Sequence, residues 1–164
     1  MEDLSIQLHN EKKIISKEEF LELNDQSAHE MSLDKKLQNK ALEVLIDADK
    51  HRWVHQATWF GEPLLNLPQD MFALQDIIWR TKPDYIIEVG VAWGGGLLFD
   101  ATLLEMLGGK KVIGVDIFMP DDLRERLSSH GKLSERLELI EGSSTASETM
   151  DQIKSIIGGS KNVL

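Results

Sequence analysis

Four short runs of apolar, often β-branched residues, spaced about 25 positions apart, constrain the fold of this chain more than any other feature. These runs are Tyr85–Gly90, Lys111–Ile117, Leu137–Ile140 and Asn162–Leu164. Segments with helical periodicity separate them. Such runs are typical of strands buried on both faces, and alternation with helices favours a parallel sheet with right-handed crossovers. The pattern predicts an α/β fold with a Rossmann-like, doubly wound parallel sheet.

The sequence before Tyr85 predicts helices and a domain boundary. Residues 1–68 are interpreted as a polar extension followed by a helical region, and residues 69–164 as the first half of the Rossmann-like domain. A short helix is expected near Lys17–Leu23, and another begins at Leu33. A further helix opens at Gln69 or Asp70 and ends before Pro83. Its inward-facing positions are Met71, Leu74, Ile77 and Ile78.

Composition excludes several classes of protein. The 164 residues include 18 basic and 28 acidic side chains, which argues against non-specific binding to nucleic acid. Because the chain has no cysteine, it has no disulfide framework, thiolate zinc site or cysteine nucleophile. No apolar stretch is long enough for a membrane span, and the first residues do not resemble a secretory signal. We expect a soluble, cytoplasmic protein, with the charged N-terminal third as a solvated face or an arm for homo-oligomer formation.

A glycine-rich loop follows the first buried strand. It contains Gly90, Gly94, Gly95 and Gly96 and lies where open parallel sheets bind ligands, beyond the carboxyl end of a strand. Glycine permits tight turns and lets a ligand lie against the main chain. A nucleotide-type cofactor is the functional interpretation, and a plain strand-to-helix turn is the alternative.

Polar residues also follow the next two strands. Asp116 ends the second strand, where a carboxylate can accept both ribose hydroxyls of an adenosine cofactor, although it can also cap the next helix. Ser143 and Ser144 follow the third strand and are candidates for contact with an adenine ring. The alternative is ordinary N-capping of the next helix by Ser144 or Thr145, and a capping box at Thr145–Glu148 is expected to open that helix.

Glu88 discriminates between cofactors. It interrupts an apolar strand two residues before Gly90, and a buried charge is costly unless it is paired or binds a ligand. A pyrophosphate would be repelled there, whereas the ammonium and sulfonium of S-adenosylmethionine would not. The spacing of Gly90, Gly94 and Gly96 also fits the nicotinamide loop of short-chain dehydrogenases. The Tyr-x-x-x-Lys pair of those enzymes is absent, because Val89 stands four places after Tyr85.

Several separated motifs resemble one family. They are Trp59–Pro63, Pro68–Asp70, Gln75–Ile78, Lys82–Asp84, Ile87–Gly90, Val115–Ile117, His130, Arg136 and Ile140–Thr145. In this order they resemble the cephalosporin hydroxylase / rhamnosyl O-methyltransferase family of bacterial enzymes, over roughly residues 41–164. The resemblance implies a Rossmann-type methyltransferase that uses S-adenosylmethionine and a sugar or natural-product acceptor, with a divalent ion such as Mg²⁺ in some members.

The resemblance also assigns roles to residues. It implies that Glu88, Gly90 and Gly94–Gly96 form the loop at the methionine end of the cofactor. Asp116 would hold the ribose, and Ser143, with Ser144 as a second candidate, would lie near adenine. The family usually has serine where this chain has Gly96, so weaker binding is expected. The family's metal ligands and most of its acceptor pocket are expected beyond Leu164.

No catalytic residue and no metal ligand is assigned in this chain. His51 and His55 share a helical face, but no companion carboxylate–histidine motif accompanies them. The first hypothesis is an S-adenosylmethionine-dependent O-methyltransferase. The second is a truncated or degenerate cofactor-binding module without catalysis, and a nicotinamide-dependent oxidoreductase is the third.

Overall fold

The computed structural model describes residues 15–164, so the first part of the predicted polar extension, residues 1–14, lies outside the described residues. The chain forms two compact units, Met1–Lys50 and His51–Leu164. Residues 51–68, expected to belong with the N-terminal region, are part of the second unit. No helix in the described range 15–164 has the length and apolar character needed to cross a bilayer.

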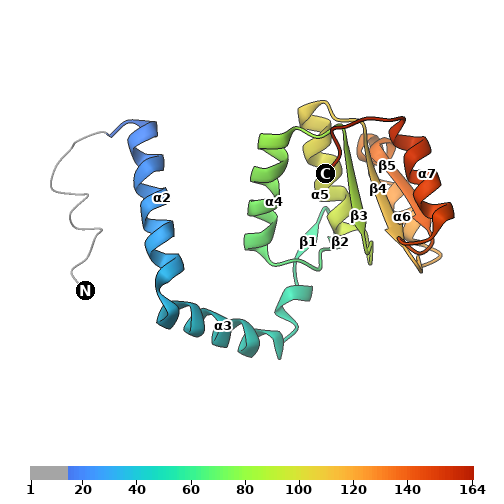
Figure 1. Cartoon of the computed structure of the whole chain (residues 1–164). Helices are drawn as coiled ribbons and strands as arrows, with labels where there is room; N and C mark the ends of the chain where they lie inside the picture. Colours follow the sequence, from blue (N-terminus) through green and yellow to red (C-terminus); the bar gives the residue numbers. More distant parts are fainter. Residues whose placement is uncertain (1–14) are drawn as a thin grey trace. The chain divides into compact units, whose positions relative to one another are not determined.

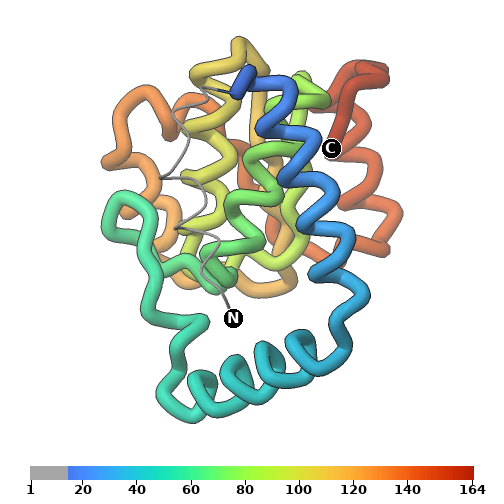
Figure 2. Tube along the Cα trace, turned by 90° about the vertical axis from the view of Figure 1, so that its left-hand side faces the viewer, coloured from blue at the N-terminus to red at the C-terminus, as the bar shows by residue number. Residues whose placement is uncertain are grey.

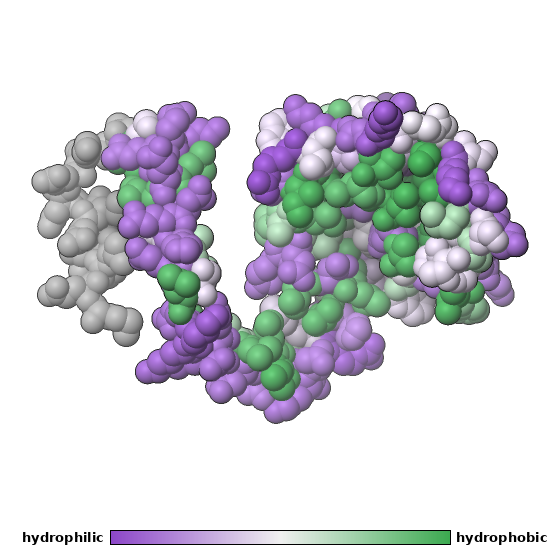
Figure 3. Space-filling model, in the orientation of Figure 1, coloured by the Kyte–Doolittle hydropathy of each residue, from purple (hydrophilic) through white to green (hydrophobic). Residues whose placement is uncertain are grey.

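Among its described residues, 15–50, the first unit forms the helices α2 (Lys17–Leu33) and α3 (Lys35–Asp49). The side chains of Ser16 and Asp34 cap them by accepting hydrogen bonds from main-chain N–H groups three residues on. α2 is much longer than the short helix expected near Lys17–Leu23. Neither helix buries a residue, and Figure 3 shows hydrophobic residues interspersed with hydrophilic ones along both.

A parallel sheet forms the centre of the second unit (Figure 1). β4 (Lys111–Asp116) lies between β3 (Tyr85–Val89) and β5 (Leu137–Glu141). Val163 forms a parallel bridge with Tyr85 at the free edge of β3, so the predicted fourth run begins to pair there. The chain runs from β3 through β4 to β5 in one direction and then returns to the opposite side of β3 at residues 162–164. This reversal creates a topological switch point at β3.

Helices cover both faces of the sheet, as the doubly wound prediction requires. α5 (Gly95–Leu107) and α6 (Leu123–Ser128) pack on one face in a cluster with Ile86 and Val112. α7 (Ser147–Ile157) packs on the other face through Ile153 in a cluster with Ile113 and Val115. Alternate residues of each strand thus point to opposite cores.

Smaller elements complete the second unit. α4 (Pro68–Thr81) lies beside α5, as Figures 1 and 2 both show. A short hairpin of β1 (Thr58–Trp59) and β2 (Glu62–Pro63) precedes α4. Two 3₁₀ turns are present, η1 (Trp53–His55) and η2 (Gly131–Arg136).

Two local predictions are wrong. Ile77 is 39% exposed, because α4 turns its neighbour Ile78 fully into the core and successive helical positions lie about 100° apart. The capping box at Thr145–Glu148 does not form. α7 begins at Ser147 with Ala146 at the N-cap position and no side-chain cap, since the hydroxyl of Thr145 instead lies 3.1 Å from that of Ser143.

Candidate functional site

A cleft of about 370 Å³ opens at the carboxyl end of β3, beside the switch point. Its floor is the end of β3 and the loop that follows, and Asp116 lines it from the end of β4. The segment between β2 and α4 forms the opposing wall. The lining residues are Pro63, Leu65, Asn66, Glu88, Val89, Gly90, Val91, Ala92, Gly96 and Asp116.

The glycine loop has two functions in the structure. Gly90 (φ +91°) and Gly96 line the cleft. Gly94 and Gly95 do not line it. A Cβ on Gly95 would lie 2.3 Å from the carbonyl oxygen of Pro63, so this glycine lets the start of α5 approach the β2 segment closely. Gly94 adopts φ +90° at the N-cap of α5.

Glu88 lies over Gly96. A Cβ on Gly96 would be 2.4 Å from Oε1 of Glu88, so the carboxyl occupies the space that any larger residue would need. Burial raises the pKa of Glu88 to about 8, with a further contribution from the nearby Asp100 carboxyl. Its Oε2 atom is buried and has no hydrogen-bond partner among the described residues. This oxygen therefore keeps an unused capacity to accept a hydrogen bond.

Asp116 holds the loop. Its Oδ2 accepts hydrogen bonds from the N–H groups of Val91 (2.8 Å) and Ala92 (3.3 Å), and its Oδ1 accepts one from Phe118 N–H (3.2 Å). Burial acts to raise the pKa of Asp116, but the backbone N–H donors of Phe118, Val91, Ala92 and Ile117 outweigh it and lower the pKa. The alternative in which Asp116 caps the following helix does not form, because α6 starts at Leu123 with Asp122 at its N-cap.

Ser143 and Ser144 follow β5 at the same edge of the sheet, two strands away from β3. They do not line the cleft. The Ser143 hydroxyl contacts Thr145 instead, and neither serine caps α7. The structure therefore brings together Glu88, Gly90, Gly96 and Asp116 and leaves the two serines apart from them.

Asn66 lines the cleft and Asp100 lies near Glu88, although sequence reasoning selected neither residue. Asn66 belongs to a turn-rich segment before α4 and reaches the cleft only through the fold. Asp100 had a signal in the sequence, because it is the one acid in the apolar run Leu97–Ala101 of α5. It is 4% exposed, and burial raises its pKa to about 7.

Arg126 of α6 joins the loop to the β1–β2 hairpin. It pairs with Glu62 of β2 and with Asp122, and its Nη1 donates to the carbonyl oxygen of Trp93 at 3.3 Å. Its guanidinium also lies 5.9 Å from the centre of the Trp93 ring. Both walls of the cleft are thereby connected through one side chain.

Within residues 15–164, no three His, Cys, Asp or Glu side chains gather in a way that could hold a metal ion. The fold and the cleft define a Rossmann-like α/β protein with an acidic site at its switch point. A sequence model of the family described as Rhamnosyl O-methyltransferase/CmcI matches residues 51–164, and the chain belongs to this family.

One curated relative is the Rhamnosyl O-methyltransferase of Mycobacterium leprae (strain TN), which is 32% identical over 83 residues, covering 46% of this chain and 36% of the relative. The chain thus spans little more than a third of that relative's length. Solved structures with a similar arrangement include "cmcI-D160 Mg-SAM" (24% identity, 59% of this chain, 40% of that chain, TM-score 0.46). Another is "CmcI-N160 apo-structure" (24% identity, 61% of this chain, 41% of that chain, TM-score 0.48).

Proposed function

We propose that residues 51–164 bind S-adenosylmethionine at the β3 cleft and supply the cofactor half of an O-methyltransferase. The observation that carries this proposal is the Glu88 carboxyl: Glu88 lines the cleft, its carboxyl lies against Gly96, and one of its oxygens is buried without a hydrogen-bond partner among the described residues. A carboxyl there complements a cationic ligand and disfavours the pyrophosphate of a dinucleotide. Membership of the methyltransferase family supports the same conclusion.

The residues of the cleft suit the parts of this cofactor. Glu88 and the main chain at Gly96 face its methionine end. Asp116 is assigned to the ribose, since it lines the cleft at the end of β4, where a carboxylate can accept hydrogen bonds from ribose hydroxyls. Ser143 and Ser144, which follow β5 outside the cleft, are assigned to the adenine end. The sulfonium methyl supplies the electrophile, and the protein contributes alignment with the acceptor.

The acceptor in this proposal is the hydroxyl of a sugar or natural product. A divalent cation such as Mg²⁺ is proposed for the family's chemistry, with ligands outside the residues described for this chain. Location in the cytoplasm and homo-oligomer formation remain predictions from the sequence.

Isothermal titration calorimetry with S-adenosylhomocysteine tests the proposal, with NAD titrated separately. We expect binding of S-adenosylhomocysteine and none of NAD. Asp116→Asn should weaken binding by about 1–3 kcal/mol, because a charged acceptor is lost. Asp121→Asn is the matched control, because Asp121 is exposed and the substitution removes the same negative charge. Binding of NAD alone would favour a nicotinamide-dependent oxidoreductase, and binding of neither ligand would refute the cofactor site.

Methyl transfer is tested apart from binding. If S-adenosylhomocysteine binds but the chain transfers no methyl group to any of a panel of sugar and phenolic acceptors, the cofactor-binding module without catalysis is the better description of this chain.

A further inference from the structure

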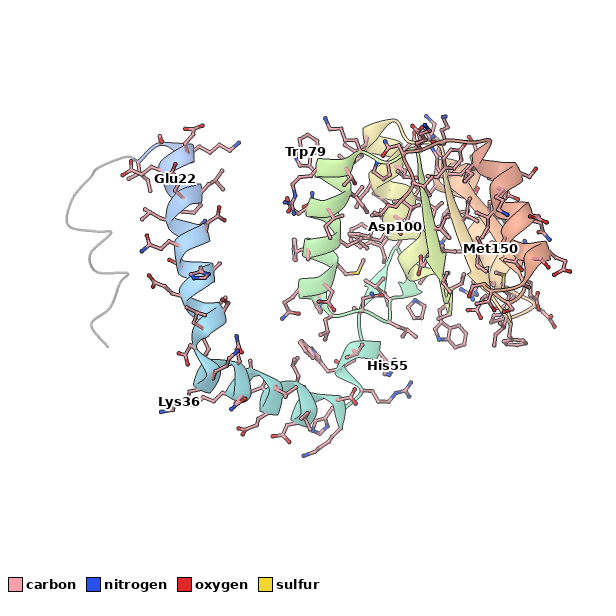
Figure 4. The ribbon with its side chains drawn as sticks, in the orientation of Figure 1. Glu22, Lys36, His55, Trp79, Asp100 and Met150 are labelled. Atoms are coloured by element: carbon pink, nitrogen blue, oxygen red, sulfur yellow. The ribbon has the colours of Figure 1, made fainter. Side chains whose placement is uncertain are left out.

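A second cavity of about 290 Å³ lies next to the cofactor cleft. Glu88 of β3 and Asp100 of α5 both line it, and it shares Asn66, Glu88, Val89 and Gly96 with the cleft. Figure 4 labels Asp100 in the interior of the second unit, near α5 and β3. Carboxyl-bearing residues from two different elements thus line a cavity next to the proposed cofactor site.

Each carboxyl keeps a buried oxygen without a partner. Oε2 of Glu88 and Oδ1 of Asp100 receive no hydrogen bond from any described residue. A buried polar atom left in this state costs about 1–3 kcal/mol, so the fold maintains an arrangement that a donor would stabilise. In addition, Asp100 lies between Phe99 and Ala101, where an apolar residue would pack without that cost.

The environment of the pair favours one retained proton. Burial raises the pKa of Glu88 to about 8, aided by the charge of Asp100, and burial raises the pKa of Asp100 to about 7. Two ionised carboxyls would also repel each other in a space of low polarity. Near neutral pH the empty pair therefore holds at least one proton.

No nearby cation neutralises the pair among the described residues. Leu164 also lines the cavity, and its carbonyl oxygen accepts a hydrogen bond from Ile87 N–H. The other charged groups on the surrounding elements are exposed or engaged with other partners. These groups are Asp70, Asp76 with Arg80, Glu62 with Arg126, Glu105 with Arg136, Lys111 with Glu138, and Asp116 with the loop N–H groups.

We infer that Glu88 and Asp100 together form a subsite for an organic ammonium group, and that filling it expels the proton held by the pair. The inference rests on the proposed function, in which the ammonium is the α-amino group of the cofactor's amino-acid end. An ammonium offers three N–H donors, which suit the unpartnered oxygens. Two carboxyls without a third ligand suit a metal ion less well. The ammonium keeps its own protons, and the proton of the pair passes to the solvent.

Calorimetry of the full chain in phosphate and in Tris at pH 7 tests the subsite, because the difference in heat between these buffers counts the protons released. S-adenosylhomocysteine should release close to one proton per molecule bound. 5′-Methylthioadenosine, which lacks the amino-acid end, should bind more weakly and release none. This comparison uses the unaltered protein, so it does not depend on a variant that folds.

Variants then locate the effect. Asp100→Asn should weaken S-adenosylhomocysteine binding about tenfold and reduce proton release, while leaving 5′-methylthioadenosine binding unchanged. Some release should persist, because burial alone still raises the pKa of Glu88. Asp121→Asn should change neither. Equal affinity and equal proton release in Asp100→Asn would overturn the subsite while the proposed function stood.

Two further outcomes bear on the assignment. If neither adenosine ligand bound the unaltered chain, the proposed function and the subsite would both be overturned. If Mg²⁺ titrated alone bound with an Asp100-dependent proton release, the subsite would be a metal site and the ammonium assignment would be wrong.

Discussion

Replacement of Gly96 by alanine tests the close approach of Glu88 to the start of α5. The new Cβ would lie 2.4 Å from Oε1 of Glu88, which is 1.0 Å inside the 3.4 Å where ordinary contact begins. Overpacking of this kind costs about 1–3 kcal/mol. Alanine recovers about 0.5–1 kcal/mol through its better helix propensity. We therefore expect Gly96→Ala to lower the free energy of unfolding by about 0.5–2 kcal/mol.

A double-mutant cycle identifies the cause of this loss. In a Glu88→Ala background the obstacle is gone, so Gly96→Ala should become neutral or stabilising, with a coupling energy of about 1–3 kcal/mol. Gly95→Ala is the comparison, because its Cβ would meet the Pro63 carbonyl oxygen at 2.3 Å. That obstacle is main chain, so Glu88→Ala should not relieve it. Urea denaturation followed by circular dichroism at pH 6 measures all the variants. The same loss for Gly96→Ala with and without Glu88 would refute the packing argument.

Three further predictions follow from the site. The free energy of unfolding should fall by roughly 2–4 kcal/mol between pH 4 and pH 8. In the unfolded chain Glu88 and Asp100 lose their protons near pH 4, whereas in the folded protein their pKa values are about 8 and about 7. The stabilisation is therefore fully present below pH 4 and is lost as the pH rises, and Glu88→Gln should flatten the pH profile measured by urea titration. Arg126→Met should lower stability by about 1–3 kcal/mol, since the largely buried Glu62 carboxylate loses its arginine partner and keeps, among the described residues, only His130 Nε2, 3.8 Å from its Oε1. An unchanged Tm would contradict the bridging role. Asp116→Asn should increase amide hydrogen exchange in the loop, because the Asp116 carboxylate accepts hydrogen bonds from two loop N–H groups, those of Val91 and Ala92. Unchanged exchange would show that the loop does not depend on that carboxylate.

Much of the second unit followed from local patterns. The runs at Tyr85, Lys111 and Leu137 form strands, because β-branched apolar residues without polar alternation suit a strand covered on both faces. Pro83 and the glycines after Leu107 and Ile157 correctly marked the helix ends. The N-terminal helices were harder to predict in extent, since α2 has no buried face from which a strong periodicity could arise.

Local patterns in the sequence identified some residues of the candidate site but not others. Glu88 and Asp116 stood out because each is a carboxylate at a strand end, where a parallel sheet places its ligand. Asn66 and Asp100 were not selected, since their position in the site depends on how α4 and α5 pack against β3. The capping prediction at Thr145 failed because the Ser143 hydroxyl offered a competing partner two residues away.

The amino-acid sequence by itself determined the alternation of strands and helices, the position of the glycine loop, and the presence of two carboxylates at strand ends, because these depend on local propensity and spacing. The tertiary structure alone decided which groups share the cleft. It placed Gly94 and Gly95 in packing contacts, set the Asp116 carboxylate against the loop N–H groups, and brought Asp100 beside Glu88. Proximity across elements depends on how the helices pack on the sheet, and no local pattern encodes it.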